Sequence, residues 1–426
     1  MGHRIREDDN FPQGSIVNVL TRPLMSEPPQ AGAADEKTAL DHDVELSVVI
    51  PCLNEADTLA DCVRTAQTAI RENGIAGEVI VADNGSSDGS VEIAIQLGAR
   101  LIEVPEKGYG SALMGGIAAA RGKFIVMGDA DGSYDFLEIP RFLEKLREGY
   151  DLVQGCRLPS GGGKVMPGAM PVLHRLIGNP IFSLMARRWF HSALHDAHCG
   201  LRGFTKAHYD AIDQRCIGME FATEMIIKSS LFGGRAAEVP ITLYPDARKA
   251  HGPHLKTFRD GWRHLRFYLL CTPRRLFLAP GVILIALGVV AYALALPNVH
   301  FRGVGFDTNT LLFGTLGFLC GYQAIFFAIF AKVLAIRERL LPEDMRISRF
   351  LNLFNLEVGL VIAAGALMIG LILLGVAINQ WRVADFGHLD YAHTMRFVVP
   401  GATLTALGFQ TILSAFMISF LDLEHR

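Results

Sequence analysis

Two aspartates separated by one residue follow a predicted strand and give the strongest chemical signal in the sequence. The strand covers residues 123–128, and Asp129-Ala-Asp131 comes directly after it. On an extended segment, residues i and i+2 point to the same side, so both carboxylates can bind one divalent cation. Magnesium is typically held by one or two carboxylates together with substrate phosphate oxygens. The pair therefore predicts a Mg²⁺ or Mn²⁺ site at a diphosphate leaving group, against the alternative of a solvated turn that caps the next helix.

Alternating strand and helix patterns surround this pair. Short apolar runs predict strands, and segments with a helical apolar period predict helices between them. The predicted strands are 46–50, 78–82, 100–104 and 123–128, and the predicted helices are 57–72, 90–97 and 111–120. This alternation is typical of a Rossmann-like, mostly parallel α/β sheet covered by helices. We expect one such domain over residues 45–250.

Polar residues also follow the other predicted strands. Asn54 and Glu55 follow the first strand, and Asp83 follows the second. Because ligands of such sheets bind at the carboxyl ends of the strands, we expect these side chains to gather near Asp129 and Asp131.

A glycine-rich turn imitates a dinucleotide fingerprint. Gly108-Tyr-Gly110 opens a helix, but it follows the third strand and has Leu113 where a third glycine would stand. No NAD site is supported. The turn is adequately explained as a tight entry to the helix, and Gly108 is a candidate for lining the donor pocket.

Four long apolar segments fill the C-terminal third. They cover residues 276–296, 310–331, 358–378 and 397–421, and none contains Asp, Glu, Lys or Arg. About 20 apolar residues cross a bilayer as a helix, so we predict an all-α transmembrane domain of four helices over residues 276–426. Buried core helices are the alternative.

Basic residues in the connecting segments predict the orientation. Arginine and lysine are concentrated before the first span and between the second and third spans. The positive-inside rule then puts the N-terminal domain and both termini in the cytoplasm. We expect a multi-pass protein of the cell (inner) membrane. Within residues 251–275, Phe258, Trp262 and Leu265 share one helical face, which predicts an amphipathic interfacial helix. A helix packed on the domain is the alternative.

Composition narrows the class of protein. The 426 residues are 50% apolar and 19% charged, and the mean hydropathy is +0.29. These values exclude collagen, coiled coil and a chain that is disordered throughout. The formal net charge of −3 offers no electrostatic footprint for nucleic acid.

The seven cysteines form no CxxC pair and are interpreted as reduced thiols. Residues 1–44 are polar, without a signal peptide, and we expect a disordered tail.

Several segments together resemble the GT-A glycosyltransferases of family 2. They are Val49-Ile-Pro51-Cys-Leu-Asn54-Glu55, Asp83-Asn-Gly-Ser-Ser-Asp88-Gly, Lys107-Gly-Tyr-Gly110 and Asp129-Ala-Asp131. Others resemble polyprenyl-phosphate (dolichyl-phosphate) mannosyl- and glucosyltransferases, namely Gly155-Cys-Arg157, Asp196-Ala-His-Cys-Gly-Leu-Arg202, Met219-Glu220-Phe-Ala-Thr-Glu224 and the basic stretch 248–256. The resemblance covers about residues 45–275 and is specific as a set of motifs.

The resemblance implies a membrane-bound inverting hexosyltransferase. The sugar would move from a UDP- or GDP-linked donor to polyprenyl phosphate, with Mg²⁺ or Mn²⁺ as cofactor. The implied donor-binding residues are Pro51, Asn54, Glu55, Asp83 and Asp129, and the metal ligands are Asp129 and Asp131. The candidates for gripping the acceptor phosphate are Arg157, Arg175, Arg202, Arg248 and Lys256, whose chemistry suits phosphate. The catalytic candidates are Asp131 and Asp196.

The role of Asp196 stays open between base and structural group. A lipid phosphate is already an anion at neutral pH, so its attack on the anomeric carbon needs no strong general base. Two departures from the family pattern also matter. Asn84 replaces a frequent aspartate, and Ser133 replaces a glutamine that is common in mannosyltransferases, which weakens an assignment of mannose.

Two other functions are weighed against this one. The first is transfer to a neutral glycolipid or a growing polysaccharide, although the Gln-x-x-Arg-Trp motif of processive synthases is absent. The second is a membrane subunit with a degenerate transferase domain, which the intact Asp129 and Asp131 disfavour. The expected partners are the donor, the lipid acceptor and the bilayer; a second copy, a flippase or a downstream transferase are candidates.

Three histidines have a spacing that fits one helical face. His191, His195 and His198 lie at i, i+4 and i+7. A metal site there is the less favoured interpretation; a helix surface or support for the active site is favoured.

Overall fold

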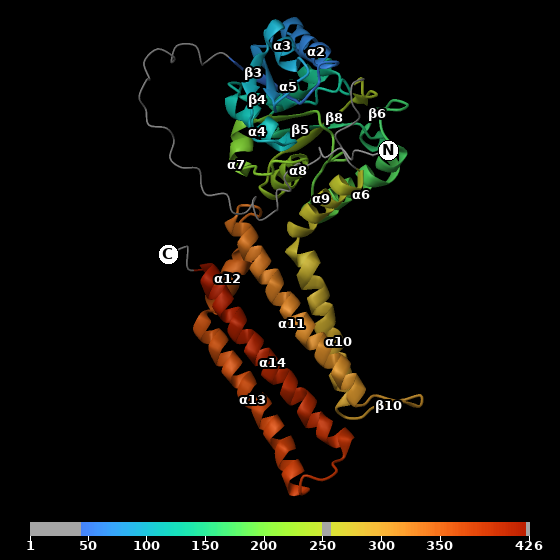
Figure 1. Ribbon diagram of the computed structural model, residues 1–426, viewed down its shortest axis with the longest axis vertical. Helices are drawn as coiled ribbons and strands as arrows, with labels where there is room; N and C mark the ends of the chain where they lie inside the picture. Colours follow the sequence, from blue (N-terminus) through green and yellow to red (C-terminus); the bar gives the residue numbers. More distant parts are fainter. Residues whose placement is uncertain (1–43, 249–256, 423–426) are drawn as a thin grey trace, which may run out of the picture. The chain divides into compact units, whose positions relative to one another are not determined.

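The computed structural model describes residues 44–248 and 257–422 (Figure 1). The chain divides into two compact units between Phe267 and Tyr268. The first unit is an α/β domain built on one large sheet, and the second is a bundle of long apolar helices. The expected GT-A-like α/β fold and the four-helix transmembrane part are both confirmed.

The large sheet has seven strands in the order β3-β2-β1-β4-β7-β5-β8. β7 runs antiparallel to β4 and β5, whereas the other neighbouring pairs are parallel. The strand bounds are Leu46–Cys52 (β1), Gly77–Asp83 (β2), Arg100–Glu103 (β3), Phe124–Met127 (β4), Leu152–Cys156 (β5), Arg202–Thr205 (β7) and Ala236–Pro240 (β8). A small parallel pair joins β6 (Lys164–Val165) to β9 (Thr242–Leu243).

Helices cover both faces of this sheet (Figure 1). Their bounds are Leu59–Glu72 (α2), Ser90–Gln96 (α3), Tyr109–Ala119 (α4), Ile139–Arg147 (α5), Asn179–Phe190 (α6), Lys206–Ile212 (α7), Glu220–Leu231 (α8) and Thr257–Leu270 (α9). The four predicted strands and three predicted helices are present, with ends shifted by one or two residues. Three of the predicted strands, β1, β2 and β4, are apolar runs that are mostly buried, the pattern expected of central strands. The edge strand β3 is only partly buried.

The core forms where helices pack on β1 and β2. α2 buries Leu59, Val63, Ala66 and Ile70, which recur at helical spacing. α4 packs closely enough that a Cβ at Gly116 would lie 2.6 Å from Val49 Cγ1. Both helices therefore hold the strands whose ends carry the polar residues.

The predicted thiols are confirmed as free. None of the seven cysteines forms a disulfide, and six of them are buried. Burial raises the pKa of Cys52 to about 11 and that of Cys62 to about 12, so both remain neutral thiols near pH 7.

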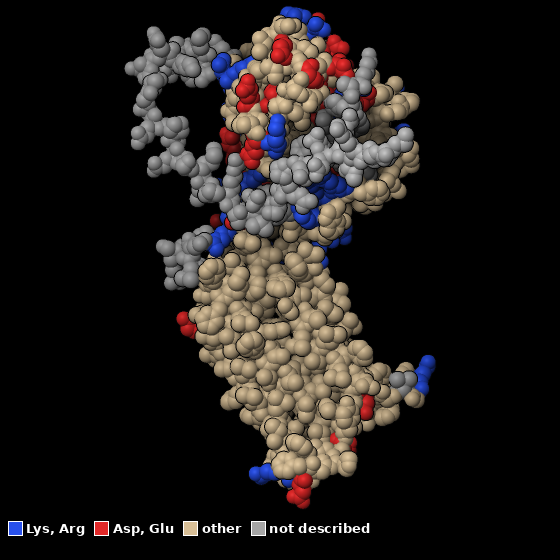
Figure 2. All heavy atoms as spheres, viewed as in Figure 1, with Lys and Arg blue, Asp and Glu red and all other residues tan. Residues whose placement is uncertain are grey.

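The second unit contains four helices that are long and apolar enough to cross a membrane. They cover Arg274–Ala295 (the turn η4 and α10), Thr308–Arg337 (α11), Leu356–Val383 (α13) and Tyr391–Leu421 (in α14). α10 itself spans Ala279–Ala295, and a short helix, α12, covers Met345–Leu353. Figure 2 shows a surface over these helices that is almost free of charged side chains.

Glycines allow the first two of these helices to approach closely. A Cβ at Gly321 would lie 2.7 Å from Gly281 O, and one at Gly288 would lie 2.9 Å from Gly314 O. Small residues at such contacts are typical of helix association in bilayers, because they bring the two backbones together.

Candidate active site

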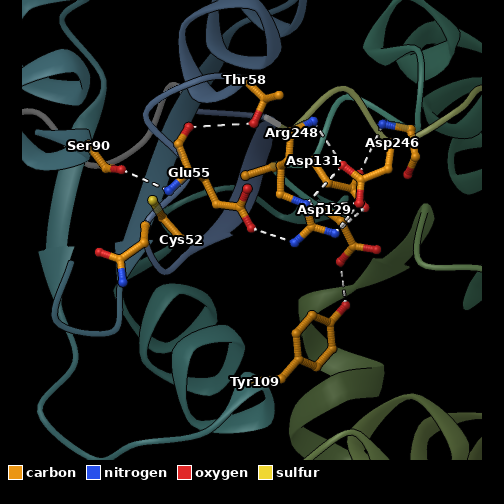
Figure 3. A network of polar contacts seen from close by, with 12 residues as sticks. Cys52, Glu55, Thr58, Ser90, Tyr109, Asp129, Asp131, Asp246 and Arg248 are labelled. Atoms are coloured by element: carbon orange, nitrogen blue, oxygen red, sulfur yellow. Dashed lines mark hydrogen bonds and ion pairs between the residues drawn. The ribbon is translucent and has the colours of Figure 1, made fainter. Parts of the chain in front are cut away.

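The polar residues predicted at the strand ends lie along one edge of the sheet. β1 pairs in parallel with β2 and β4, so the chain segments that follow these strands meet at the same edge. Asp83 ends β2, Glu55 follows β1, and Asp129 and Asp131 follow β4. Figure 3 shows Glu55, Asp129 and Asp131 close together.

Arg248 joins three carboxylates at this edge (Figure 3). Its Nη1 donates to Glu55 Oε1 at 3.0 Å, and its Nη2 lies 3.6 Å from Asp131 Oδ2. Its Nε donates to Asp246 at 2.9 Å. The side chain of Arg248 is only 9% exposed. The guanidinium therefore neutralises a group of acidic residues that would otherwise repel one another.

Asp129 is held by Tyr109 and lies against Gly200. The Tyr109 hydroxyl donates to Asp129 Oδ1 at 2.8 Å. A Cβ at Gly200 would lie 2.3 Å from Asp129 Oδ2, so the glycine makes room for the carboxylate. Burial and the nearby charge of Asp131 raise the pKa of Asp129 to about 6. The Tyr109 hydrogen bond and the positive charge of Arg202 partly offset that rise.

Asp83 and Asn54 organise the loop that follows β2. Asp83 Oδ2 accepts the amide of Gly85 at 2.9 Å, and Asn54 Oδ1 accepts the amide of Ser87 at 2.8 Å. Asn54 is non-glycine with φ 60°, a strained conformation typical of functional turns. Pro51 lies buried within β1.

The structure explains why an amide stands at position 84. Asn84 Nδ2 donates to Val104 O at 2.9 Å and to Glu106 O at 2.8 Å, and its Oδ1 accepts the amide of Gly108. A carboxylate could not make the two donor bonds. Asn84 therefore ties the segment after β3 to the end of β2, rather than offering an acceptor to a ligand.

Asp196 forms a buried pair with Arg157. Arg157 Nε donates to Asp196 Oδ2 at 2.7 Å, and Nη2 donates to Oδ1 at 2.8 Å. Burial alone would raise the pKa of Asp196, but the charge and hydrogen bonds of Arg157 lower it overall. Of the two roles left open for Asp196, the geometry favours the structural one, because both carboxylate oxygens are occupied.

Arg202 is fully buried, which disagrees with its predicted role as a phosphate ligand. Its relative exposure is 0%, and its two Nη atoms donate to Cys199 O at 2.7 Å and Ala222 O at 2.9 Å. Burial lowers the pKa of this guanidinium, while Tyr109 and Asp129 act in the opposite direction. Arg202 therefore lies beneath the site as a fixed positive charge and does not reach its surface.

The other acceptor candidates differ in position. Arg157 is 7% exposed, and its Nη1 donates to the Tyr134 hydroxyl at 3.4 Å. Only a small part of its guanidinium is therefore accessible from the site. Arg175 lies exposed on the turn His174–Gly178, directly before α6. Lys256 lies outside the described residues.

The histidine spacing does not correspond to one helix. α6 ends at Phe190, and His191 adopts a left-handed conformation with φ 58°. His195 instead contacts Glu238 at 2.7 Å. The ring of His198 lies beside that of His264 in a tilted arrangement, with ring centroids 4.7 Å apart. The helix-surface interpretation is therefore wrong, because the chain leaves the helix before the second histidine. Among described residues, no cluster of three or more metal-binding side chains of the His, Cys, Asp and Glu types occurs.

Sequence reasoning missed several residues of the site. Tyr109 was treated only as part of a glycine turn, and Asp246 and Tyr134 were not considered as site residues. Tyr134 accepts the Gly200 amide at 2.9 Å. A search for aromatic hydroxyls beside the glycine turn and the Asp-x-Asp motif would have selected both tyrosines.

The residues at this edge fit a divalent cation. Asp129 and Asp131 supply the hard oxygen ligands that divalent cations such as magnesium prefer. The contact between Arg248 and Asp131 shows that a positively charged group is already accommodated beside these carboxylates. Two carboxylates leave the remaining coordination to substrate phosphates and water, as is usual for magnesium.

Comparison with known proteins agrees with this architecture. Residues 47–212 match the family described as glycosyl transferase family 2. Residues 329–422 match the glycosyltransferase family 2 C-terminal transmembrane region. The chain is 36% identical to the low-salt glycan biosynthesis hexosyltransferase Agl6 of Haloferax volcanii, over 88% of this chain and 89% of that protein.

More distant similarities cover the catalytic part. The undecaprenyl-phosphate 4-deoxy-4-formamido-L-arabinose transferase of Salmonella paratyphi B is 31% identical over 46% of this chain and 59% of that protein. Glucosyl-3-phosphoglycerate synthase from Mycobacterium tuberculosis, solved with Mn²⁺ and UDP, has a TM-score of 0.41 and 22% identity, over 53% of this chain and 79% of that one.

The fold, the strand-end carboxylates and the apolar C-terminal helices are those of a glycosyltransferase with a transmembrane region. The chain belongs to glycosyltransferase family 2 and carries the transmembrane region of that family. It is a membrane glycosyltransferase.

Proposed function

We propose that the protein transfers a hexose from a UDP- or GDP-linked donor to polyprenyl phosphate, with inversion, at the cytoplasmic face of the inner membrane. The observation that carries this proposal is the pair Asp129 and Asp131 at the carboxyl end of β4, beside Glu55 and Arg248. The similarity to a hexosyltransferase and to an undecaprenyl-phosphate sugar transferase supports the sugar class and the acceptor.

The donor diphosphate would lie along this edge of the sheet. Asp129 and Asp131 would hold Mg²⁺ or Mn²⁺, and the bound cation would neutralise the charge that develops on the leaving diphosphate. Asn54, Glu55 and Asp83 would bind the nucleoside, and Gly108 would line its pocket. Arg248 would exchange its contacts with Glu55 and Asp131 for contacts with phosphate oxygens.

The acceptor phosphate would act as the nucleophile without deprotonation. One of its oxygens forms a bond to the anomeric carbon while the bond from that carbon to the donor diphosphate breaks, and the electron pair leaves with the diphosphate. A single displacement inverts the anomeric centre. No base is required, which is consistent with the engagement of Asp196 by Arg157.

Exposed apolar residues near Arg175 support a lipid acceptor. The turn before α6 and α6 itself expose Val172, Leu176, Ile181 and Leu184. A soluble domain seldom leaves so many large apolar side chains on one element unless they contact a partner or a membrane. Arg175 lies among them and would bind the phosphate group of a lipid at the membrane surface.

α9 adds a second element of this kind. Phe258 and Trp262 are 85% and 59% exposed. The opposite side of α9 is buried in the catalytic unit, where His264 Nδ1 lies 2.7 Å from Thr223 Oγ1. α9 therefore packs on the domain and also presents an apolar face, which supports the proposed interfacial role.

The proposal is tested by sugar transfer in membranes that contain the protein. Radiolabelled UDP-glucose, UDP-GlcNAc and GDP-mannose are each supplied with Mg²⁺ or Mn²⁺ and polyprenyl phosphate, and Asp131→Asn serves as the control. We expect metal-dependent label in a lipid that releases its sugar in mild acid, and none with the variant. Label in a neutral glycolipid or polymer instead would overturn the proposed acceptor.

A further inference from the structure

A buried ion pair lies on α8, away from the carboxylates of the site. Lys228 Nζ is 2.8 Å from Glu224 Oε1, and the two side chains are 1% and 0% exposed. Desolvating such a pair is costly, and replacing one by apolar residues is often neutral for stability. A gain in folding stability therefore does not explain why this pair is present. The groups that bind to the pair indicate its role instead.

The pair fixes a loop between α7 and α8. Glu224 Oε2 accepts the backbone amides of Arg215 and Cys216 at 3.0 and 2.8 Å. Lys228 Nζ donates to Asp213 O at 2.6 Å. Both ends of the short segment 213–216 are thus tied to one turn of α8, which leaves the loop little freedom.

This loop supports the first turn of α4. Ser111 N donates to Ile217 O at 3.1 Å. A Cβ at Gly108 would lie 2.3 Å from Ile217 O, and one at Gly110 would lie 2.2 Å from Cys216 O. The two glycines therefore let the start of α4 rest directly on the loop backbone, and a displacement of the loop must displace the helix start.

Tyr109 stands between those two glycines, and its hydroxyl donates to Asp129 Oδ1 (Figure 3). We propose that Tyr109 is a positioning residue that orients the Asp129 carboxylate toward the divalent cation, and that the Glu224–Lys228 pair positions Tyr109 through the loop 213–217. The inference rests on the proposed function, because it takes Asp129 as a metal ligand. Hydrogen-bond partners of metal ligands orient them in this way in many proteins.

The direct test is Mn²⁺ binding to the detergent-solubilised full chain, read from the electron paramagnetic resonance signal of free Mn²⁺. Mn²⁺ alone is the probe, without donor or acceptor. Tyr109→Phe keeps the ring and removes the hydroxyl, and we expect its Mn²⁺ affinity to fall about 10- to 100-fold. Tyr209→Phe is the matched control, because that tyrosine packs on Phe204 and Phe221 and does not contact Asp129 in the structure. Equal affinities for the two variants would overturn the role of Tyr109.

The longer connection is tested on α8. Glu224→Gln should weaken Mn²⁺ binding several-fold, whereas Glu220→Gln, one turn earlier and near Arg263, should leave it unchanged. Because Glu224→Gln strands Lys228 and can destabilise the fold, the double variant Glu224→Leu with Lys228→Met is measured as well. It removes the charges together and should fold, but it leaves the Arg215 and Cys216 amides without their acceptor. If it binds Mn²⁺ as tightly as the unmodified protein, the connection through the loop is wrong.

The outcomes separate this inference from the proposed function. If Mn²⁺ binds and responds to the variants as expected while polyprenyl phosphate receives no sugar, the acceptor assignment alone fails. If the unmodified protein binds no Mn²⁺, the metal assignment and this inference fail together. A kinetic readout distinguishes a fault in metal binding from general damage, since Tyr109→Phe should raise the metal concentration needed for half-maximal rate more than it lowers the rate at saturating metal.

Discussion

Arg157 and Asp196 are joined by two parallel hydrogen bonds, Nε to Oδ2 at 2.7 Å and Nη2 to Oδ1 at 2.8 Å, inside the catalytic unit. The backbone amide of Arg157 adds a third bond to Oδ2 at 3.0 Å. A carboxylate bound on both oxygens, with a lowered pKa, is a poor proton acceptor. The pair is therefore consistent with the proposed nucleophile, a lipid phosphate, which is already ionised at neutral pH and needs no base.

The first prediction concerns the stability of this pair. Asp196→Asn leaves a buried guanidinium without its counter-charge, and we expect it to lower the free energy of unfolding by about 3–5 kcal/mol. Glu45→Gln is the control, because the Glu45–Arg147 pair is partly exposed and should contribute about 1 kcal/mol or less. Chemical unfolding of the detergent-solubilised protein measures both. An Asp196→Asn variant as stable as Glu45→Gln would contradict the structural role.

The second prediction concerns Arg248 as an internal cation. Its guanidinium lies 3.6 Å from Asp131 and would compete with a metal for that carboxylate. Arg248→Gln should therefore bind Mn²⁺ about tenfold more tightly without nucleotide, because a nearby positive charge is removed. The same variant should transfer sugar more slowly, because the proposed phosphate contact is lost. Arg64→Gln, an exposed arginine on α2, is the control. Weaker Mn²⁺ binding by Arg248→Gln would show that Arg248 orients Asp131 rather than competing for it.

The third prediction concerns His198 and His264, whose rings lie side by side where α9 packs against α8. Burial lowers the pKa of both His198 and His264, and the charge of His264 further lowers that of His198. Glu220 and Asp260 act in the opposite direction on His264 but do not outweigh its burial. The unfolded chain therefore binds more protons than the folded one below about pH 6.5, so stability is full above that pH and falls as the pH drops. We expect the melting temperature to decline between about pH 6.5 and 5.

A double substitution checks the assignment of this pH dependence. His198→Gln with His264→Gln should flatten the decline between about pH 6.5 and 5, since each histidine contributes up to about 1.4 kcal/mol for every unit of its pKa shift. His300→Gln, at an exposed position in the second unit, should leave the slope unchanged. An unaltered slope in the double variant would assign the pH dependence to other groups.

The fourth prediction tests the apolar face formed by the turn His174–Gly178 and α6. Leu176→Glu with Ile181→Glu should raise the KM for polyprenyl phosphate at least several-fold, because charged side chains disfavour contact with a lipid surface. Binding of Mn²⁺ should not change, since neither residue contacts the carboxylates. Ile95→Glu is a matched control, as Ile95 is 60% exposed on α3. If the Leu176→Glu, Ile181→Glu double variant and the Ile95→Glu control have the same KM for polyprenyl phosphate, this apolar face does not contact the membrane during transfer.

The fifth prediction concerns the glycines at the start of α4. Gly110→Ala puts a methyl group 2.2 Å from Cys216 O, and the backbone must shift to relieve the contact. We expect a loss of about 1–3 kcal/mol in stability, as for other overpacked positions. Gly261→Ala in α9 meets no atom within 4 Å and should be neutral or slightly stabilising. Comparable melting temperatures for the two variants would contradict the close packing of α4 on the loop.

The parallel half of the sheet and the strand-end carboxylates were predictable from local patterns. Continuous apolar runs such as 46–50 and 123–128 define strands, and the polar residues follow them directly in the chain. The four apolar segments were predictable for the same reason, because length and hydropathy suffice. The order of the central strands then follows from known α/β topology.

The remaining features depend on contacts between distant residues. Arg248 meets Glu55 across 193 positions in the sequence, and no pattern in either segment indicates the meeting. From its residue type alone, Arg202 could be an accessible phosphate ligand. Only its position in β7 shows that it is buried. The spacing of His191 and His195 fits a helix, but His191 leaves the helical conformation and ends α6.

The reversed direction of β7 has a consequence for how such enzymes diversify. Arg202 at the start of β7 pairs with Met127 at the end of β4, so the segment that precedes β7 arrives at the carboxylate edge from a separate stretch of chain. Residues 46–131 thus supply one side of the site, residues 154–202 approach it from the other, and Asp246 and Arg248 come from a third stretch. Under the proposed function, substitutions in the later stretch would redirect which molecule receives the sugar, while the earlier stretch would continue to serve the same donor. In a lineage that acquires new glycans, recipient and donor preferences can therefore evolve at different rates within one gene.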